Sequence, residues 1–292
     1  MTRAANAGPI DDAIDASKRG DYATVMRLLR PLAEKGDAVA QVVLGLMYKD
    51  GRGSPQDYRE AAKWYQLAAE QGEAEGQNSL GVRYENGQGV PQDYKEAAKW
   101  YRRAADQGHA PAQMNLGTMY ENGKGVAQDY KEALRWYQLA ADQGNASSQN
   151  NLGTMYGNGR GVPQDNKEAA KWYRLAADQG NASGQNNLGA MYAEGLGVPQ
   201  NYKEALRWYR LSAGQGDSGG QYNLGTMYGN GRGVPQDYVL AQMWLSIAAA
   251  AGEKAAINNI DYLSKRMTAD QLEQARILAN QCQQSKFKNC KS

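Results

Sequence analysis

Few side chains in this sequence have the types and spacings that catalysis or metal binding needs. The chain holds one histidine, His109, and two cysteines, Cys282 and Cys290. A Ser-His-Asp triad therefore has a single candidate base, and a metal site built from His and Cys has too few ligands. Residues Ser285 to Lys288 fit the S-x-x-K pattern of serine acylases, but neither S-D-N nor K-T-G occurs in the chain. We expect a protein without cofactor or metal that is not an enzyme.

Two recurring patterns are similar to ligand-binding motifs. Six copies of G-x-G lack the third glycine and the lysine of nucleotide-binding loops, and they follow expected helices rather than strands. A methionine column, which could supply soft metal ligands, comprises Met47, Met119, Met155, Met191 and Met227. Methionine three residues beyond a core leucine usually fills gaps in a hydrophobic core. We therefore interpret the glycines as turns between helices and the methionines as core residues.

Basic and aromatic residues also stand next to one another, as in nucleic-acid-binding repeats. The pairs are Lys63-Trp64, Lys99-Trp100, Arg135-Trp136, Lys171-Trp172 and Arg207-Trp208. A glutamate precedes each base by three residues, and Arg102 and Arg174 are each followed by an aspartate four residues later, so opposite charges meet on a helix. With 33 basic and 31 acidic residues, the net charge of +2 creates no field that attracts phosphate. We interpret the pairs as a solvated, salt-bridged face and expect no nucleic-acid partner.

The elements that carry these residues repeat every 36 positions. All six tryptophans are 36 residues apart, from Trp64 to Trp244, and a Leu-Gly pair and a tyrosine recur with the same step. Of the 292 residues, 41% are hydrophobic, and the mean hydropathy is −0.75. No stretch approaches the roughly eighteen apolar residues that a membrane-spanning helix needs. We expect a soluble, folded repeat protein that does not insert into a membrane.

Each repeat contains two expected helices, as the fourth repeat illustrates. Its first half begins at the N-cap residue Asn145 and ends at an Asn-Gly pair; we name this helix A. Its second half, helix B, opens with Asp165 and Glu168 as a capping box, carries apolar residues at helical spacing and ends at Gly180. His109 stands at the start of the third repeat, where others carry Asp, Asn or Glu, and we interpret it as an exposed turn residue.

A glycine recurs inside helix A of all six repeats, for example Gly153, although glycine in a helix interior costs about 1 kcal/mol relative to alanine. We expect the close approach of a neighbouring helix to compensate for this cost. The small residues Ala176 and Ala177 of helix B are the expected facing surface. Trp172 and Tyr173 are expected to provide most of the area buried between repeats.

The periodicity divides the chain into three expected regions. Residues 1–36 form an N-terminal cap with a partial repeat, and residues 37–252 form six 36-residue repeats. Residues 253–292 form a degenerate repeat and a C-terminal capping helix with a cysteine-containing tail. Thr268 and Gln271 predict a capping box at the start of that last helix. The prediction amounts to about sixteen helices in a stacked array.

The motif A-x-x-Q-x-x-LG-x-x-Y-x-x-G-x-GV-x-x-D-x-x-x-A-x-x-WY-x-x-AA-x-x-G, readable from Ala146 to Gly180, resembles the Sel1-like repeat, a relative of the tetratricopeptide repeat. The resemblance implies an all-α fold, a right-handed α/α superhelical solenoid of helix-turn-helix repeats. It also implies an adaptor that acts in signalling, secretion or host contact. The departures are small: Asn166 replaces a tyrosine, Ala127 replaces the turn proline, and Asn201 replaces the capping aspartate.

The cysteines and the tail bear on the compartment. Cys282 and Cys290 resemble the disulfide spacing of cysteine-rich members of the family, and the tail is similar to the cap of bacterial exported members. We expect a disulfide in a periplasmic or secreted bacterial protein. Ala5-Asn6-Ala7 is similar to a signal-peptide cleavage site without an apolar segment before it, which we interpret as a mature form given a start methionine. The alternative is a cytosolic protein with reduced thiols that regulates a signalling kinase or secretion machine. A second alternative is a β-lactamase-like hydrolase, because some cysteine-rich relatives have been linked to that activity.

Positions that differ between repeats are available for specific contacts. Four positions of helix A lie on one stripe, opposite the packed Leu and Tyr, and in the tetratricopeptide fold this stripe lines the concave surface. We expect a monomer that binds a partner protein or an extended peptide there. The expected groove residues are Glu75, Asn78, Glu85, Met114, Thr118, Glu121, Asn150, Thr154, Asn186, Tyr222 and Thr226.

Asparagines and glutamates distinguish this stripe. Amide side chains offer paired donors and acceptors for a peptide backbone, and the three glutamates favour a basic segment. The alternative is that the asparagines only cap helices and solvate the wall. The first interpretation predicts that replacing Asn150 and Asn186 by alanine weakens partner capture without lowering thermal stability.

Overall fold

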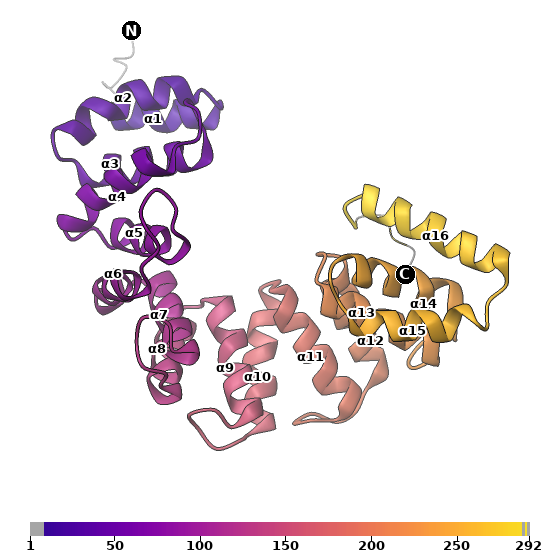
Figure 1. Cartoon of the computed structure of the whole chain (residues 1–292). Helices are drawn as coiled ribbons and strands as arrows, with labels where there is room; N and C mark the ends of the chain where they lie inside the picture. The colour runs from indigo at the N-terminus through magenta and orange to yellow at the C-terminus, as the bar shows by residue number, and fades with distance from the viewer. Residues whose placement is uncertain (1–8, 288–289, 291–292) are drawn as a thin grey trace, which may run out of the picture. The chain divides into compact units, whose positions relative to one another are not determined.

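The computed structural model describes residues 9–287 and residue 290, and these form sixteen α-helices. The chain divides into two compact units, Met1–Gln143 and Gly144–Ser292, each with its own core. Figure 1 shows the helices following one another in pairs within each unit. No described helix is long and apolar enough to cross a membrane. The expected all-α repeat fold is confirmed. The A-x-A segment at residues 5–7 lies outside the described residues.

The helices alternate between the A and B types. Unit 1 contains α1 (Pro9–Lys18), α2 (Tyr22–Glu34), α3 (Ala38–Asp50), α4 (Tyr58–Glu70), α5 (Ala74–Asn86), α6 (Tyr94–Asp106), α7 (Ala110–Asn122) and α8 (Tyr130–Asp142). Unit 2 contains α9 (Ala146–Asn158), α10 (Asn166–Asp178), α11 (Ala182–Glu194), α12 (Tyr202–Ala213), α13 (Ser218–Asn230), α14 (Tyr238–Ala250), α15 (Ala255–Ser264) and α16 (Ala269–Gln284). The odd-numbered helices from α3 to α13 are A helices, and the even-numbered helices from α4 to α14 are B helices.

Local residue chemistry sets the ends of the helices. The Asn145 side chain accepts a hydrogen bond from Ser148 N, as expected for an N-cap, and α9 ends at Gly159 in the left-handed conformation (φ 65°). In α10 the Asp165 side chain accepts from two backbone N–H groups, but Glu168 pairs with Lys171 (2.6 Å) rather than returning to the cap. The capping box predicted there is therefore only half formed. The box predicted at the start of α16 is complete.

The glycine inside helix A is matched by a tyrosine of the same repeat. A Cβ on Gly153 would lie 2.5 Å from the ring of Tyr173, so the glycine forms a notch that the ring fills. The expectation that Ala176 and Ala177 face Gly153 is wrong. Ala176 instead faces Gly184 of the next A helix, where a Cβ would lie 2.7 Å away. A tyrosine thus closes the helix pair in the first five repeats, and Leu245 takes its place in the sixth. The small alanine surface stacks one pair on the next.

Polar side chains also connect successive repeats. The buried Gln185 amide donates to Ala177 O (3.2 Å), and Gln185 Oε1 accepts from Gln215 (2.8 Å). Arg102 and Arg174 bond the hydroxyls of Tyr120 and Tyr192, which belong to the following repeats. The predicted pairing of these arginines with aspartates four residues later is therefore wrong, because the aromatic hydroxyl of the next repeat is the nearer partner.

The outer faces of the B helices carry the predicted ion pairs. In each of five repeats a glutamate pairs with a base three residues later, for example Glu204 with Arg207 (3.4 Å). At the end of unit 2, α15 and α16 both pack on α14. The division of the chain at residues 36 and 252 stays a prediction.

Candidate functional site

The A helices form the more closely packed side of each unit. α3 contacts α5, α9 contacts α11, and α11 contacts α13. Among the described residues, successive B helices make no contact of that extent. In unit 2 the A helices therefore make a surface that is continuous from one repeat to the next, as a groove for an extended ligand requires.

In unit 2 the asparagines of this surface form a ladder between repeats. Asn187 Nδ2 donates to Asn150 Oδ1 (2.9 Å), and Asn223 Nδ2 donates to Asn186 Oδ1 (2.8 Å). The amide donors Nδ2 of Asn150 and Asn186 have no partner among the described residues. The ladder thus uses the acceptor of each predicted groove asparagine and leaves its donor for a ligand. It also means that alanine at these positions would remove bonds between repeats as well as ligand contacts.

Small side chains flank these donors. Gly157 and Ala193 occupy the stripe positions that carry glutamate in unit 1, so a peptide backbone can approach the helices closely. Thr154 Oγ1 donates to Asn150 O (3.2 Å) and accepts from the Tyr173 hydroxyl (3.2 Å). Burial and the nearby charge of Glu194 raise the pKa of Tyr209. Tyr209 therefore remains a neutral donor.

A cavity of about 390 Å³ lies at the C-terminal end of this surface. The predicted residues Tyr222 and Thr226 line it together with Gly225, Gly229, Asn230, Leu245, Asn259, Tyr262 and Leu263. Thr226 Oγ1 donates to Tyr222 O (3.0 Å), and the Tyr222 hydroxyl accepts from Asn259 Nδ2 (3.5 Å). The cavity has two aromatic hydroxyls and two amides over an apolar floor, which suits a peptide side chain with its adjoining backbone.

Two residues of this cavity, Asn259 and Tyr262, were missed by the sequence prediction. They belong to α15, whose sequence keeps few residues of the repeat motif, so its alignment with the A helices is hard to recognise. The signal was available, because each lies 36 residues after a residue of the A surface, Asn223 and Thr226 respectively. Extending the period by one more repeat would have found both.

In unit 1 the stripe carries more charged side chains, and several of its polar groups are bonded within the chain. Asn115 Nδ2 donates to Asn78 Oδ1 (3.0 Å), which repeats the ladder of unit 2. Thr118 Oγ1 donates to Met114 O (3.1 Å) and lies 3.0 Å from the Tyr137 hydroxyl. These contacts place Asn78, Met114 and Thr118 on one face and leave only part of their polar capacity for a ligand.

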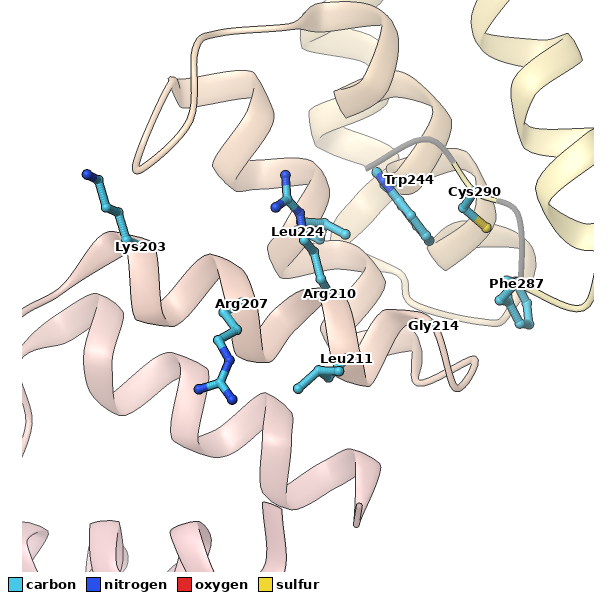
Figure 2. A pocket seen from close by; sticks show the side chains of 9 residues that line it. All are labelled: Lys203, Arg207, Arg210, Leu211, Gly214, Leu224, Trp244, Phe287 and Cys290. Atoms are coloured by element: carbon cyan, nitrogen blue, oxygen red, sulfur yellow. The ribbon is translucent and has the colours of Figure 1, made fainter. Parts of the chain in front are cut away.

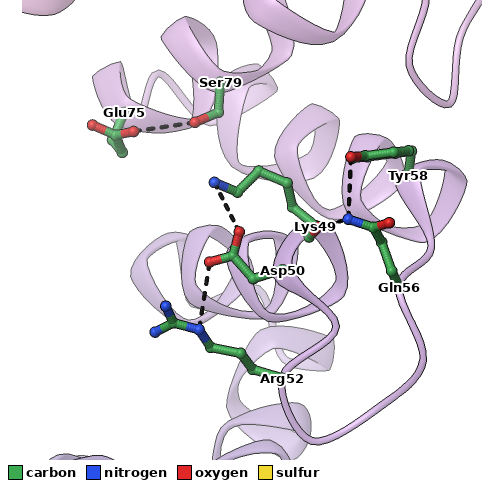
Figure 3. Close-up of polar contacts among 7 residues, drawn as sticks. All are labelled: Lys49, Asp50, Arg52, Gln56, Tyr58, Glu75 and Ser79. Atoms are coloured by element: carbon green, nitrogen blue, oxygen red, sulfur yellow. Dashed lines mark hydrogen bonds and ion pairs between the residues drawn. The ribbon is translucent and has the colours of Figure 1, made fainter. Parts of the chain in front are cut away.

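Glu75 is occupied by two partners of the chain itself. Its carboxylate accepts from Ser79 Oγ (3.1 Å, Figure 3) and lies 3.1 Å from His109 Nε2. The hydrogen bond from His109 lowers the pKa of Glu75. His109 is the N-cap of α7, because its Nδ1 accepts from Ala112 N (3.3 Å). The interpretation of His109 as an exposed turn residue is wrong: it takes the capping place of Asp or Asn and also joins two repeats.

The other two glutamates of the predicted acidic stripe accept from buried tyrosines. Tyr101 donates to Glu85 (2.7 Å), and Tyr137 donates to Glu121 (2.8 Å). Burial and the bond to Glu85 raise the pKa of Tyr101. These carboxylates are therefore fixed by the fold, and the acidic stripe offers a basic segment less free charge than the sequence implies.

Polar contacts in the turn after α3 hold the C-terminal end of that helix in place. Gln56 Nε2 donates to Lys49 O (2.7 Å) and to the Tyr58 hydroxyl (3.1 Å), and Lys49 pairs with Asp50 (3.0 Å), which also pairs with Arg52 (Figure 3). A glutamine closes the turn in the same way in the other five repeats. These polar contacts belong to the scaffold and not to a ligand site.

The tail shows little of the proposed hydrolase chemistry. Ser285 Oγ donates to Cys282 O (2.8 Å), and Lys288 of the S-x-x-K pattern lies outside the described residues. The sulfurs of Cys282 and Cys290 are bonded in the structure. Within the described segments, no group of three or more His, Cys, Asp or Glu side chains is placed to hold a metal.

A family model described as the Sel1 repeat matches the chain in six consecutive segments. These are residues 38–73, 74–109, 110–145, 146–181, 182–217 and 218–253. None of the curated proteins matches the chain. The family match therefore covers the A and B helices from α3 to α14.

Two solved structures are similar over most of the chain. A Sel1 repeat protein from Oxalobacter formigenes is 35% identical, with a TM-score of 0.77, and the match covers 83% of this chain and 97% of that protein. The protective antigen c5321 of uropathogenic Escherichia coli, which displays an SLR fold, is 40% identical, with a TM-score of 0.74 over 89% of this chain. This chain spans only 56% of the length of that antigen.

Proposed function

Because the chain belongs to the Sel1 repeat family, whose repeats are typically protein-interaction scaffolds, we propose that it binds an extended peptide segment of a partner protein. The binding surface is the A-helix surface of unit 2, from Asn150 and Asn186 to the cavity lined by Tyr222 and Thr226. Binding needs no covalent chemistry, and the chain acts as a non-enzymatic adaptor.

One observation carries this proposal: amide donors without a partner in the described chain recur in successive repeats that lead to a cavity. Asn150 and Asn186 occupy equivalent places in successive repeats, and each has its oxygen bonded and its nitrogen unpartnered within the described chain. Carbonyl groups of an extended peptide accept hydrogen bonds from such amides. The cavity at Tyr222 then receives a side chain of the same peptide. Backbone bonds supply affinity, and the cavity supplies selectivity.

The test separates the two roles of each asparagine: its oxygen bonds the next repeat, and its nitrogen is the proposed contact to the peptide. Asn150→Asp combined with Asn186→Asp keeps an oxygen to accept from Asn187 and Asn223 but removes both amide donors. Peptides selected from a random library against the wild-type chain should bind this variant roughly tenfold more weakly or worse, because a carboxylate repels peptide carbonyls. Isothermal calorimetry measures the affinity, and thermal unfolding checks the fold.

The matched control is Glu168→Gln combined with Lys171→Gln, on the exposed face of α10, which should leave the affinity unchanged. Selected peptides that bind the double asparagine variant as tightly as wild type would place the site elsewhere on the chain. A library that yields no binder would contradict peptide recognition itself.

The tail and one relative support a proposal about the compartment. We propose that the protein works outside the cytoplasm, because Cys282 and Cys290 are bonded and a 40% identical structure is a protective antigen. Denatured, unreduced protein from its source should show no free thiol. Two free thiols would favour a cytosolic regulator that uses the same surface.

A further inference from the structure

A second cavity, of about 450 Å³, lies in unit 2 between α12, α13, α14 and the tail (Figure 2). One wall is the face of α12 that carries Lys203, Arg207 and Arg210. The opposite wall comes from α13, α14 and the tail, which contribute Leu224, Trp244, Phe287 and Cys290. Basic and apolar groups thus face one space of a size suited to a small ligand or one to two residues of a peptide.

Among the described residues, no acidic side chain lines the cavity beside this basic wall. Arg207 pairs at 3.4 Å with Glu204, which stands outside the lining. Arg210 donates to the Tyr228 hydroxyl (2.8 Å), but its Nε is buried and has no hydrogen-bond partner within the described chain. A buried guanidinium donor without an acceptor is costly, so Arg210 keeps a positive charge whose hydrogen-bonding capacity the fold does not use in full.

Comparison with the preceding repeat shows what is particular to this place. The equivalent cavity there is lined by Lys167, Lys171 and Arg174, and also by Asp178. The position of Asp178 is occupied by Asp106 and Asp142 in earlier repeats and by Gly214 in this one. The substitution removes the carboxylate and keeps the bases, so the positive charge at this cavity is less balanced than one repeat earlier.

The apolar wall is built by the tail. Phe287, the single phenylalanine of the chain, lies against Gly216 and donates its backbone N–H to Cys282 O (3.0 Å). Cys290, bonded to Cys282, also lines the cavity. Buried Trp244 and Leu224 complete the floor. The tail therefore converts a basic groove between repeats into a cavity that is half apolar.

We propose that this cavity binds a carboxylate joined to an apolar group. The carboxylate lies against the basic wall of α12, and the apolar group lies on Trp244 and Phe287. Such a group occurs in free aromatic or aliphatic acids and at the end of a polypeptide chain. The site is independent of the proposed peptide surface on the A helices.

The chemical class is tested with three probes on the full chain. N-acetylphenylalanine should bind, and N-acetylphenylalaninamide and acetate should each bind roughly tenfold more weakly, because each lacks one half of the ligand. Chemical shifts of the Trp244 indole report the site, and calorimetry gives the affinity. An amide that binds as tightly as the acid, or an acid that leaves the Trp244 signal unchanged, would overturn the proposal.

Variants locate the site. Gly214→Asp restores the carboxylate of earlier repeats at a helical position (φ −65°) and should weaken the acid roughly tenfold, as should Arg207→Gln and Phe287→Ala. Lys171→Gln, the equivalent of Arg207 one repeat earlier, should have no effect. Retained affinity in both Gly214→Asp and Arg207→Gln would overturn the assignment, and unchanged thermal unfolding excludes a folding defect.

A last comparison separates the two sources of the ligand. A hexapeptide that ends in phenylalanine with a free carboxylate is compared with N-acetylphenylalanine. Equal or tighter binding of the hexapeptide identifies the end of a partner chain as the natural ligand. Binding at least roughly tenfold weaker identifies a free acid.

Discussion

At the scale of single residues, His109 links a helix cap to the charge state of a glutamate 34 residues away. Its Nδ1 accepts from Ala112 N, so its Nε2 carries the proton that Glu75 accepts. The pKa of Glu75 is lowered in the folded protein. Its contribution to stability is therefore present above its unfolded pKa, about 4.3, and is lost as pH falls through the lower folded pKa.

We predict that His109→Asn keeps the cap, as Asn145 and Asn181 do, but releases Glu75. The pKa of Glu75 should rise toward its ordinary value, as measured by NMR titration of its carboxyl carbon. The variant should unfold at lower urea concentration than wild type at neutral pH, and the difference should shrink below about pH 4. A gap that grows as the solution is acidified would contradict this account.

Arg83 is a second residue whose environment breaks the pattern of its column. It is 6% exposed where the equivalent residues are Met47, Met119, Met155, Met191 and Met227, and its Nε and Nη1 have no partner in the described chain. Its guanidinium lies 5.3 Å from the Tyr58 ring. Replacing a buried, incompletely bonded charge by a well-packed apolar residue often stabilises a protein.

We predict that Arg83→Met raises the free energy of unfolding by about 1 kcal/mol, net of the lost contact with Tyr58. Urea denaturation measures the change. Arg52→Met is the control, because Arg52 lies over Tyr22 at the same 5.3 Å but is exposed. A lower unfolding midpoint for Arg83→Met would show that the arginine has contacts worth more than its burial costs.

At the scale of elements, a cation of one repeat stacks on the first residue of the preceding B helix. The turn residues Arg52, Lys124 and Arg232 lie 5.3–5.7 Å from the rings of Tyr22, Tyr94 and Tyr202. The junction between the fourth and fifth repeats departs on both sides at once: Asn166 of the fourth replaces the tyrosine, and Leu196 of the fifth replaces the cation. A Cβ on neighbouring Gly197 would touch Asn166 O, so the two segments still meet there.

We predict that Asn166→Tyr and Leu196→Arg restore this contact only when combined. A double-mutant cycle in urea should give a favourable coupling free energy of about 0.5–1 kcal/mol, because the site is exposed. Single substitutions should change stability by less than the pair does. A coupling of zero would mean that the stacked cations in the other repeats are incidental.

The elements themselves were predictable from sequence, and their partners less so. The 36-residue period and residues such as Asn145 and Thr268 predicted the helices and their caps, because capping is local. The period predicts where a glycine such as Gly153 recurs, but not which side chain occupies the space beside it. The ring of Tyr173 occupies that space. Arg102 likewise had a local candidate partner, yet it bonds Tyr120 from the next repeat. The groove asparagines were predicted as a column, but their mutual bonding depends on how repeats stack.

At the scale of the whole molecule, the stability of each helix pair depends on its contacts with the neighbouring pairs. The terminal helices have a neighbour on one side only, so their packing determines how stable the end of the array is. Unit 2 ends at α16, which packs on α14 and is joined to the tail by Cys282 and Cys290. The buried sulfur of Cys282 belongs to the same core as Trp244 and Leu263. Loss of the bond should therefore loosen the end of unit 2 and the cavity beside it, while unit 1 keeps its own core.

We predict that Cys282→Ser combined with Cys290→Ser lowers the stability of unit 2 by about 2 kcal/mol, the value expected for a short closed loop. Native-state hydrogen exchange should accelerate in α14 and α16 and stay unchanged from α1 to α8. Wild-type protein in a reductant should behave like the variant, which separates the effect of the bond from that of the serines. Faster exchange in both units alike would mean that the chain unfolds as one cooperative body and that the tail protects all of it.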